Sequence, residues 1–209
     1  MRQQIQILQN IVSRKGSSKI LTFSIPHVFK ALQLLNAEKF VSRSKFCTEL
    51  HLGEGAIKTL ILHLKEVKMV ETTKSGTYLS SKGKKFSGEL LKSIPRECQV
   101  KKCSIAQGNY NHAIILKNYS SAIKTGLEQR DYAILYGSSG CITLLYKNNN
   151  FVFPGEGIEC LNNDLVTRNA IMERLNPEEG DVIIISSSNE PFVAEVSAKN
   201  SALWTLAAR

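Results

Sequence analysis

The sequence predicts an α+β protein of two domains. In the first 93 residues, apolar residues recur mostly at helical spacing, whereas helices and strands alternate from residue 105 onward. The charge changes at the same place, because residues 1–104 carry 19 Lys+Arg and 7 Asp+Glu, and residues 105–209 carry 8 and 11. A basic half joined to a mildly acidic half indicates that only the first domain meets a polyanion.

The N-terminal segment, residues 1–19, is predicted to form a helical arm. A helix over residues 2–14 would carry Ile5, Leu8, Ile11 and Val12 on one face, and the polar run that ends at Lys19 breaks it. Three roles remain open for this arm: it dimerises, it covers the next domain, or it is a poorly ordered tail.

Residues 20–93 are predicted to form a helix-turn-helix followed by a β-wing. Helices are expected at about residues 26–36, 44–50 and 54–68, where Pro26 suits a first helical turn. A strand at 69–72, a tight turn at 74–76 and a strand at 77–79 follow, and a basic helix at 81–93 ends before Pro95. This order of elements is that of a winged helix-turn-helix domain, a shape that fits DNA grooves.

Residues 94–104 show no clear period and are predicted to be a linker. In residues 105–209 we expect strands at 112–117, 141–146, 151–153 and 181–186, with helices at 120–136, 164–175 and from 190 to the end. Ile123, Leu127 and Ile134 should be the buried stripe of the first of these helices. The order β-α-β-β-α-β-α suits a small ferredoxin-like sandwich that binds an effector, dimerises, or does both.

The helix that begins near Glu54 is the candidate reader of DNA. In a helix-turn-helix, the second helix enters the major groove and presents its N-terminal residues to base edges. Gly55 and Ala56 are small enough for close approach, Lys58 and Thr59 can reach bases or phosphates, and His63 is expected near a phosphate.

Flanking residues are expected to contact the DNA backbone. They lie before and in the preceding helix, at the tip of the wing and at the start of the basic helix: Arg43, Ser44, Lys45, Lys74, Ser75, Lys82, Lys84 and Lys85. One alternative is that these charges only solvate the surface. The other is that the domain binds a protein, which an exposed Leu62 would favour. Clustered basic residues around the motif favour double-stranded DNA.

Residues 26–92, with the turn at Leu52–Gly55 and the wing turn at Lys74–Gly76, resemble a winged helix-turn-helix domain of prokaryotic transcription regulators. Together with the second half, the chain resembles a family of archaeal winged-helix proteins whose C-terminal domain has no assigned function. The resemblance covers nearly the whole chain. It implies a DNA-binding transcription regulator and no activity for the second half, and a two-fold operator would call for a homodimer.

Two weak candidate sites for a small, anionic effector lie in the second half. One is Glu128, Arg130 and Asp131 at the edge of a predicted helix, where the alternative is structural ion pairing. The other is Ser187, Ser188 and Asn189 before the last helix, where free N–H groups attract anions and the alternative is an ordinary helix cap.

Several classes of protein are not expected. The second half has one histidine, His112, and no nucleophile motif, metal-ligand cluster or dinucleotide fingerprint, so we expect no enzyme and no cofactor. Five scattered cysteines fit neither a disulfide scaffold nor a zinc site. No apolar run approaches the length of a membrane span, and the start is a poor signal peptide, so we expect a cytoplasmic protein without membrane contact. The alternative to a regulator is a winged-helix adaptor in an informational complex.

Overall fold

The structure, a computed structural model, describes residues 1–13 and 21–208. These residues form an α+β chain with eight α-helices, α1 to α8, and two sheets. The chain divides into two compact units, Met1–Leu91 and Lys92–Arg209. The helical first half and the sheet-containing second half agree with the predicted class.

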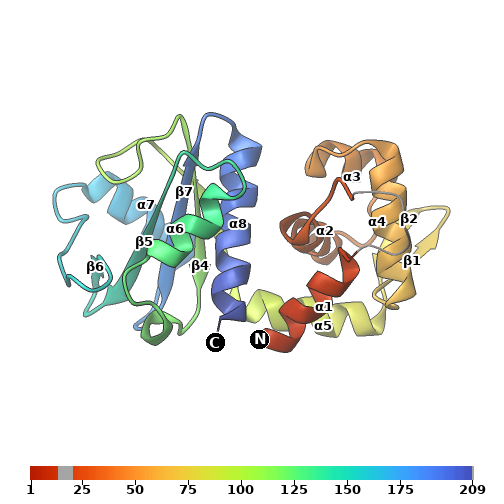
Figure 1. The fold of residues 1–209 in the computed structure, drawn as a ribbon, viewed down its shortest axis with the longest axis horizontal. Coiled ribbons are helices and arrows are strands. Elements are labelled where there is room, and N and C mark those ends of the chain that lie inside the picture. The colour runs from red at the N-terminus through yellow and green to blue at the C-terminus, as the bar shows by residue number, and fades with distance from the viewer. Residues whose placement is uncertain (14–20, 209) are drawn as a thin grey trace. The chain divides into compact units, whose positions relative to one another are not determined.

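The first unit contains five helices and a β-hairpin (Figure 1). The elements in order are α1 (Arg2–Ile11), α2 (Ile25–Ala37), α3 (Arg43–Leu50), α4 (Glu54–Glu66), β1 (Val70–Thr73), β2 (Gly76–Leu79) and α5 (Ser81–Ser93). Local chemistry fixes the helix starts, since Ser24 and His27 form a reciprocal cap on α2 and the Ser42 hydroxyl accepts the Lys45 N–H on α3 at 3.1 Å. His51 adopts a left-handed conformation after α3, which turns the chain into α4.

Helix α1 belongs to the first unit and packs against α2. It buries Ile5, Leu8 and Ile11, and the Ile11 carbonyl lies 2.6 Å from the His63 Nδ1 of α4. The role that the structure supports for α1 is therefore that of a cover on this unit. The predicted helix break at residues 14–19 lies outside the described residues.

The second unit is built on one antiparallel sheet in the order β3-β4-β7-β5-β6. Its strands are β3 (Glu97–Val100), β4 (Tyr110–Leu116), β5 (Gly140–Lys147), β6 (Asn150–Val152) and β7 (Val182–Ser188). Helices α6 (Leu127–Ile134) and α8 (Pro191–Ala207) cover one face, and α7 (Leu165–Leu175) covers the other (Figure 1).

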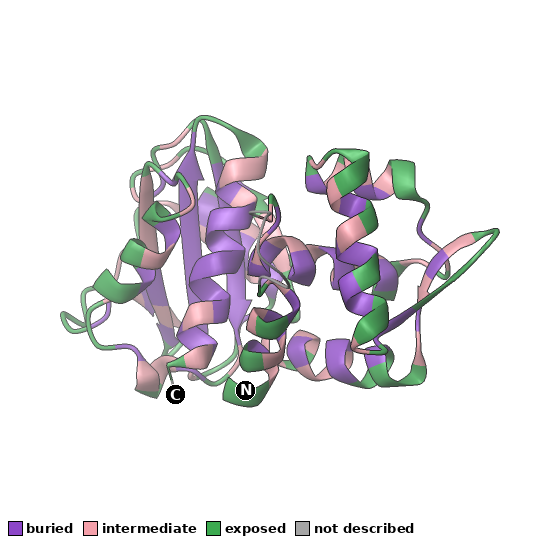
Figure 2. Ribbon diagram, turned by 45° about the vertical axis from the view of Figure 1, so that its right-hand side comes forward, coloured by how far each residue is buried: buried purple, intermediate pink, exposed green. Residues whose placement is uncertain are grey.

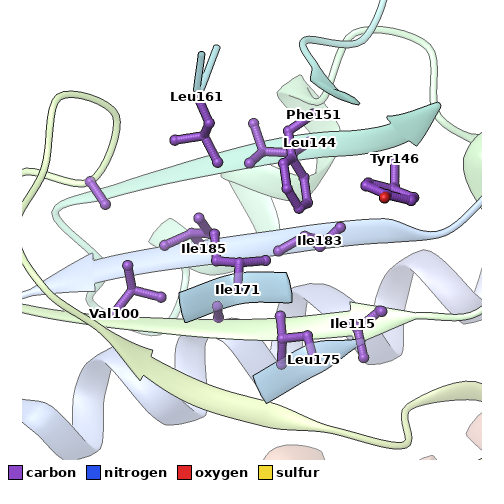
Figure 3. Packing of buried hydrophobic residues seen from close by; sticks show 12 residues of the cluster. Val100, Ile115, Leu144, Tyr146, Phe151, Leu161, Ile171, Leu175, Ile183 and Ile185 are labelled. Atoms are coloured by element: carbon purple, nitrogen blue, oxygen red, sulfur yellow. The ribbon is translucent and has the colours of Figure 1, made fainter. Parts of the chain in front are cut away.

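The core of this unit lies around β7. All seven residues of β7 are buried, and Figure 2 shows this strand and most of α8 as buried. On the face toward α7, Ile183 and Ile185 pack with Ile171 and Leu175 (Figure 3). The short apolar run that begins at Val182 is the predicted central strand.

The ferredoxin-like arrangement is not what the structure shows. In that arrangement the last strand lies at an edge of the sheet, whereas β7 lies between β4 and β5. A strand buried on both faces is more stable with a neighbour on each side, which accounts for its central place. The helix α7 on the opposite face also makes three layers instead of two.

Two further expectations are wrong. Residues 94–104 are not a linker, because Glu97–Val100 forms β3 and pairs with β4. The helix expected at 120–136 is a short 3-10 turn followed by α6, which buries Gln129 and Ala133 and leaves Leu127 58% and Ile134 43% exposed. Gly126 has a positive φ and separates the 3-10 turn from α6, so the two segments do not continue one helix face.

Candidate nucleic-acid interface

A basic groove on the first unit brings together residues from three elements. Its cations are Arg43 at the start of α3, Lys58 and Lys65 on α4, and Lys74 in the turn of the hairpin. The residues that line the groove include no Asp or Glu. The groove therefore presents a positive surface between α4 and the β1–β2 hairpin.

Backbone hydrogen bonds fix the position of the β1–β2 hairpin beside the segment that leads into α3. Val41 and Thr77 exchange two backbone hydrogen bonds of 2.9 Å. Gly76 has φ of 134°, and a Cβ at this position would lie 2.8 Å from the Val41 carbonyl oxygen. The Lys65 ammonium donates to the Thr72 hydroxyl at 3.3 Å, which joins α4 to the hairpin. These contacts between the hairpin and the helical part of the unit fix the shape of the groove.

The start of α4 is open to solvent. Gly55 is exposed, and no protein atom lies within 4 Å of the place that a Cβ would take. Lys58 is exposed, Ala56 and Thr59 are half-buried, and the Thr59 hydroxyl donates to the Gly55 carbonyl at 3.0 Å. Ser44 and Ser75 are also exposed. The first turns of α4 are therefore accessible to a large partner.

The structure contradicts the expectation for His63. This side chain is 6% exposed, contacts the Ile11 carbonyl, and packs edge-on against Phe23 with ring centroids 5.8 Å apart. It stands on the inner face of α4, where it joins α1 to the helix. His63 is therefore a structural residue and not a phosphate contact.

Other predicted cations have partners or lie away from the groove. Lys45 forms an ion pair with Glu38, and Lys82 Nζ donates to the Val67 carbonyl at 2.9 Å, where it caps α4. Lys84 lines a different hollow, beside Phe40 and Tyr78. Lys85 is exposed on α5. None of the three lysines expected to extend the basic surface onto α5 lines the groove, although Lys82 and Lys65 line a neighbouring hollow together.

Lys65 is the groove residue that the sequence reasoning missed. It lies seven positions after Lys58, and residues at this spacing share a helix face. That spacing was readable in the sequence. The contribution of the hairpin to the groove was not, because it depends on the contact between Val41 and Thr77.

The predicted effector residues of the second unit do not form one site. Ser187 and Ser188 are buried within β7, where the Ser187 hydroxyl donates to Asn111 Oδ1 at 2.6 Å and the Ser188 hydroxyl accepts the Glu190 N–H at 3.3 Å. They belong to a strand and not to a free helix start, so the anion site expected there is wrong. Asn189 is exposed, and its Oδ1 accepts from Asn109 at 3.1 Å.

The other predicted set lies on α6. Glu128, Arg130 and Asp131 are all exposed, and Arg130 lines a shallow hollow together with Cys141. Within the described part of the chain, none of the three forms a side-chain ion pair. The ion pairing that was the alternative for Arg130 and Asp131 is therefore not seen among the described residues.

A buried ionic network in the second unit could not be predicted from the sequence. Lys199 on α8 is fully buried, and its ammonium contacts both carboxylate oxygens of Glu97 on β3 and lies 3.2 Å from Glu195 Oε1. His112 Nε2 lies 3.4 Å from Glu97 Oε2. Burial raises the pKa of Glu97, but the Lys199 and His112 charges outweigh it and hold that pKa at about 2. Lys199 therefore joins α8 to β3 through its ion pair with Glu97.

Three of the cysteines have thiols that burial holds in the protonated form. Burial raises the pKa of Cys98 to about 11 and the pKa of Cys141 and Cys160 to about 12, so these thiols stay protonated at neutral pH. In residues 1–13 and 21–208, no three His, Cys, Asp or Glu side chains stand together as metal ligands. Among the described helices, none combines the length and apolar character that crossing a bilayer requires.

Comparisons with known proteins give relatives without an assigned activity. The model of a domain of unknown function, DUF4443, matches residues 107–206, which lie in the second unit. The chain is similar to a solved structure, a hypothetical protein from Pyrococcus horikoshii OT3, with 27% identity and a TM-score of 0.68 over 86% of this chain and 91% of that chain. No curated protein matches the chain. The chain thus resembles an archaeal protein over most of its length, and its second unit resembles a domain whose function is unknown.

Proposed function

We propose that the first unit is a winged helix-turn-helix domain that binds double-stranded DNA, and that the protein regulates transcription. Helices α3 and α4 follow one another across a short turn, and the β1–β2 hairpin comes directly after α4. This is the order in which such domains place a recognition helix and a wing. The observation that carries the proposal is the groove lined by four cations and no carboxylate.

The arrangement supports a division of tasks along the DNA. Arg43 on α3, Lys65 in the last turn of α4 and Lys74 in the hairpin turn lie around the first turns of α4 and suit phosphates, since their charges come from different elements along one groove. The open first turns of α4 suit base edges in the major groove, and Gly55 would allow close approach. Sequence preference should therefore depend on Lys58 and Thr59, while affinity depends mainly on the flanking cations.

A homodimer would place two such domains on one operator. Helix α6 and its C-cap residue expose an apolar stripe of Leu127, Ile134 and Leu135, of which Leu135 is 76% exposed. Arg130 and Asp131 lie beside this stripe and have opposite charges, so a second copy related by a two-fold axis could pair each with the other. We infer that the second unit dimerises through α6.

The dimer is tested by measuring the mass in solution. Leu135→Glu should give monomer, because a charge would be buried in an apolar contact, whereas Leu165→Glu on α7, which is 61% exposed, should leave the dimer intact. Dissociation by the α7 change alone would show that α6 is not the interface.

The second candidate function is a winged-helix adaptor that binds a protein. Leu62 favours it, because this side chain is 54% exposed and lines the basic groove. A solvent-exposed leucine between lysines suits a protein contact better than a phosphate contact. In this case duplex DNA would bind weakly and without sequence preference.

A salt titration with paired variants separates the two candidates. Neutralising four phosphates per protomer gives a slope of about −3.6 in log affinity against log salt concentration. The double variant Arg43→Gln/Lys74→Gln should make the slope shallower by about 1.8, whereas Lys84→Gln/Lys85→Gln, which removes the same charge from α5, should change it much less. A flat affinity for the unmodified protein, or equal effects of the two double variants, would contradict DNA binding in the groove.

A further inference from the structure

A cavity of about 510 Å³ lies in the second unit between β3, the start of β4 and one side of α7, from Val166 to Arg174. Sites for small molecules commonly fall between about 300 and 1,000 Å³, so this cavity is large enough for a drug-sized ligand. All of its lining residues come from this unit. It is separate from both of the sites that the sequence predicted, since Arg130, Ser187 and Asn189 are not among those residues.

The charges that line the cavity have one sign. Lys101 and Arg174 are its charged side chains, and neither has an ion-pair partner within residues 1–13 and 21–208. Arg174 Nη1 donates to the Gln99 carbonyl at 3.2 Å, which holds the guanidinium at the cavity and leaves its other donors available. Residues 92–209 carry 12 Lys+Arg and 12 Asp+Glu, so two cations without a carboxylate are a local excess. Such a site attracts an anion.

The cavity also has an aromatic and apolar lining. The Tyr110 side chain is 45% exposed, and Val166 on α7 is 76% exposed. Both line the cavity, where a flat apolar group could cover the surface that they leave in water. A ligand that binds here would therefore combine an anionic group with a planar body.

The loop that presents Tyr110 is held rigidly. Asn111 is buried, and its side chain donates to the Gly108 carbonyl and accepts the Gly108 N–H, each at 3.1 Å. A Cβ on Gly108 would lie 2.8 Å from the Ser187 Cβ, so this loop packs directly on β7. A site that is formed before binding avoids the entropic cost of ordering a loop. Ser187, predicted to contact an anion, instead supports this loop through Asn111.

We propose that this cavity binds a small aromatic anion, a planar molecule that carries a carboxylate or phosphate. Arg174 and Lys101 bind the anionic group, and Tyr110 and Val166 pack against the planar body. Only the role of this ligand as an effector of DNA binding rests on the proposed function.

The probe for this test is 8-anilinonaphthalene-1-sulfonate, whose fluorescence rises when it binds, measured with the full chain and without DNA. The double variant Lys101→Gln/Arg174→Gln should weaken its binding at least about tenfold, because hydrogen bonds to a charged group are lost. Tyr110→Ala should also weaken it. The matched control is Lys124→Gln/Lys147→Gln, which removes the same charge from two exposed lysines outside the cavity and should leave binding unchanged.

A neutral relative, N-phenyl-1-naphthylamine, separates charge recognition from apolar adsorption. It should bind more weakly than the sulfonate, and the Lys101/Arg174 variant should not alter its affinity. Equal binding of both compounds, or a larger loss in the Lys124/Lys147 control, would overturn the proposal. Tyr110→Phe, which keeps the ring, should retain binding even if Tyr110→Ala perturbs the loop. Because no DNA is present, a failure here would not bear on the basic groove.

Discussion

Replacing Lys199 by Met should reverse the pH dependence of the stability of the second unit. The buried ammonium contacts Glu97 and Glu195, and the pKa of Glu97 is held at about 2 against an ordinary value of 4.5. A pKa lowered by this amount corresponds to about 3 kcal/mol. Because the folded pKa is lowered, this stability is fully present above pH 4.5 and is lost as the pH falls toward 2.

The variant leaves two carboxylates in the same surroundings without the ammonium. Removing one partner of a buried ion pair costs about 3–5 kcal/mol, so the variant should be less stable by this amount at pH 7. Burial then raises the pKa of Glu97, opposed mainly by His112, and protonation relieves the cost at low pH. The difference in unfolding free energy between the two proteins should therefore shrink to below about 2 kcal/mol at pH 3.

The single tryptophan, Trp204, lies on α8 and reports on this unit alone in urea titrations. Lys124→Met, a change at an exposed lysine, should alter the stability by less than about 0.5 kcal/mol. Lys199→Met/Glu97→Gln should recover part of the loss at pH 7, because one of the stranded charges is removed. A difference that stays constant from pH 7 to pH 3 would show that the loss comes from packing, and the electrostatic reasoning would be refuted.

Three further predictions concern the first unit. Gly83→Ala should destabilise this unit, because a Cβ there would lie 2.0 Å from the Met69 carbonyl oxygen. Gly88→Ala on the same helix should stabilise it by about 0.5–1 kcal/mol, because a Cβ there meets no atom within 4 Å. Hydrogen exchange of the α5 amides measures both changes. Gly55→Ala should leave the fold intact or slightly more stable and weaken DNA binding at least about tenfold, and unchanged binding would exclude close approach at this residue. Burial lowers the pKa of His27 to about 4, so the unit should lose stability as the pH falls from 6.5 toward 4, and His27→Gln should remove that dependence of α2 amide exchange.

Local signals predicted the first unit well. Pro26, the glycine-bearing turn before α4 and the turn at Lys74–Gly76 each act within a few residues, and all mark element boundaries in the structure. Short-range chemistry determines where a helix begins and where a hairpin turns. The helix boundaries of this unit were therefore readable from the sequence.

The candidate groove was predicted only in part. Arg43, Lys58 and Lys74 were expected near DNA, and they line one groove in the structure. His63 was expected on the outside, but α1 packs over that face of α4 and buries it. Which face of a helix is covered depends on a segment 52 residues away in the chain, and periodicity alone does not reveal such a contact.

The second unit shows more clearly which parts of a fold cannot be predicted from local sequence patterns. The apolar run of β7 identified a central strand, yet its neighbours could not be read from it, and the sheet order differs from the ferredoxin-like one. Strand order and the pairing of Lys199 with Glu97, 102 residues apart, depend on long-range contacts. The apolar residues of a strand predict that it is buried, but they do not predict which strands pair with it, because many neighbours could bury it equally well.

By itself, the sequence determined the α+β class, the two-domain division, the asymmetry of charge and most of the helix and strand positions, because these follow from local propensity and composition. Only the tertiary structure decided that four cations meet in one groove, that β3 joins the sheet, and that Lys101, Tyr110 and Arg174 surround one cavity. The physical reason is that such sites are made by packing between distant segments, whose energies depend on the whole fold and not on any one stretch of chain.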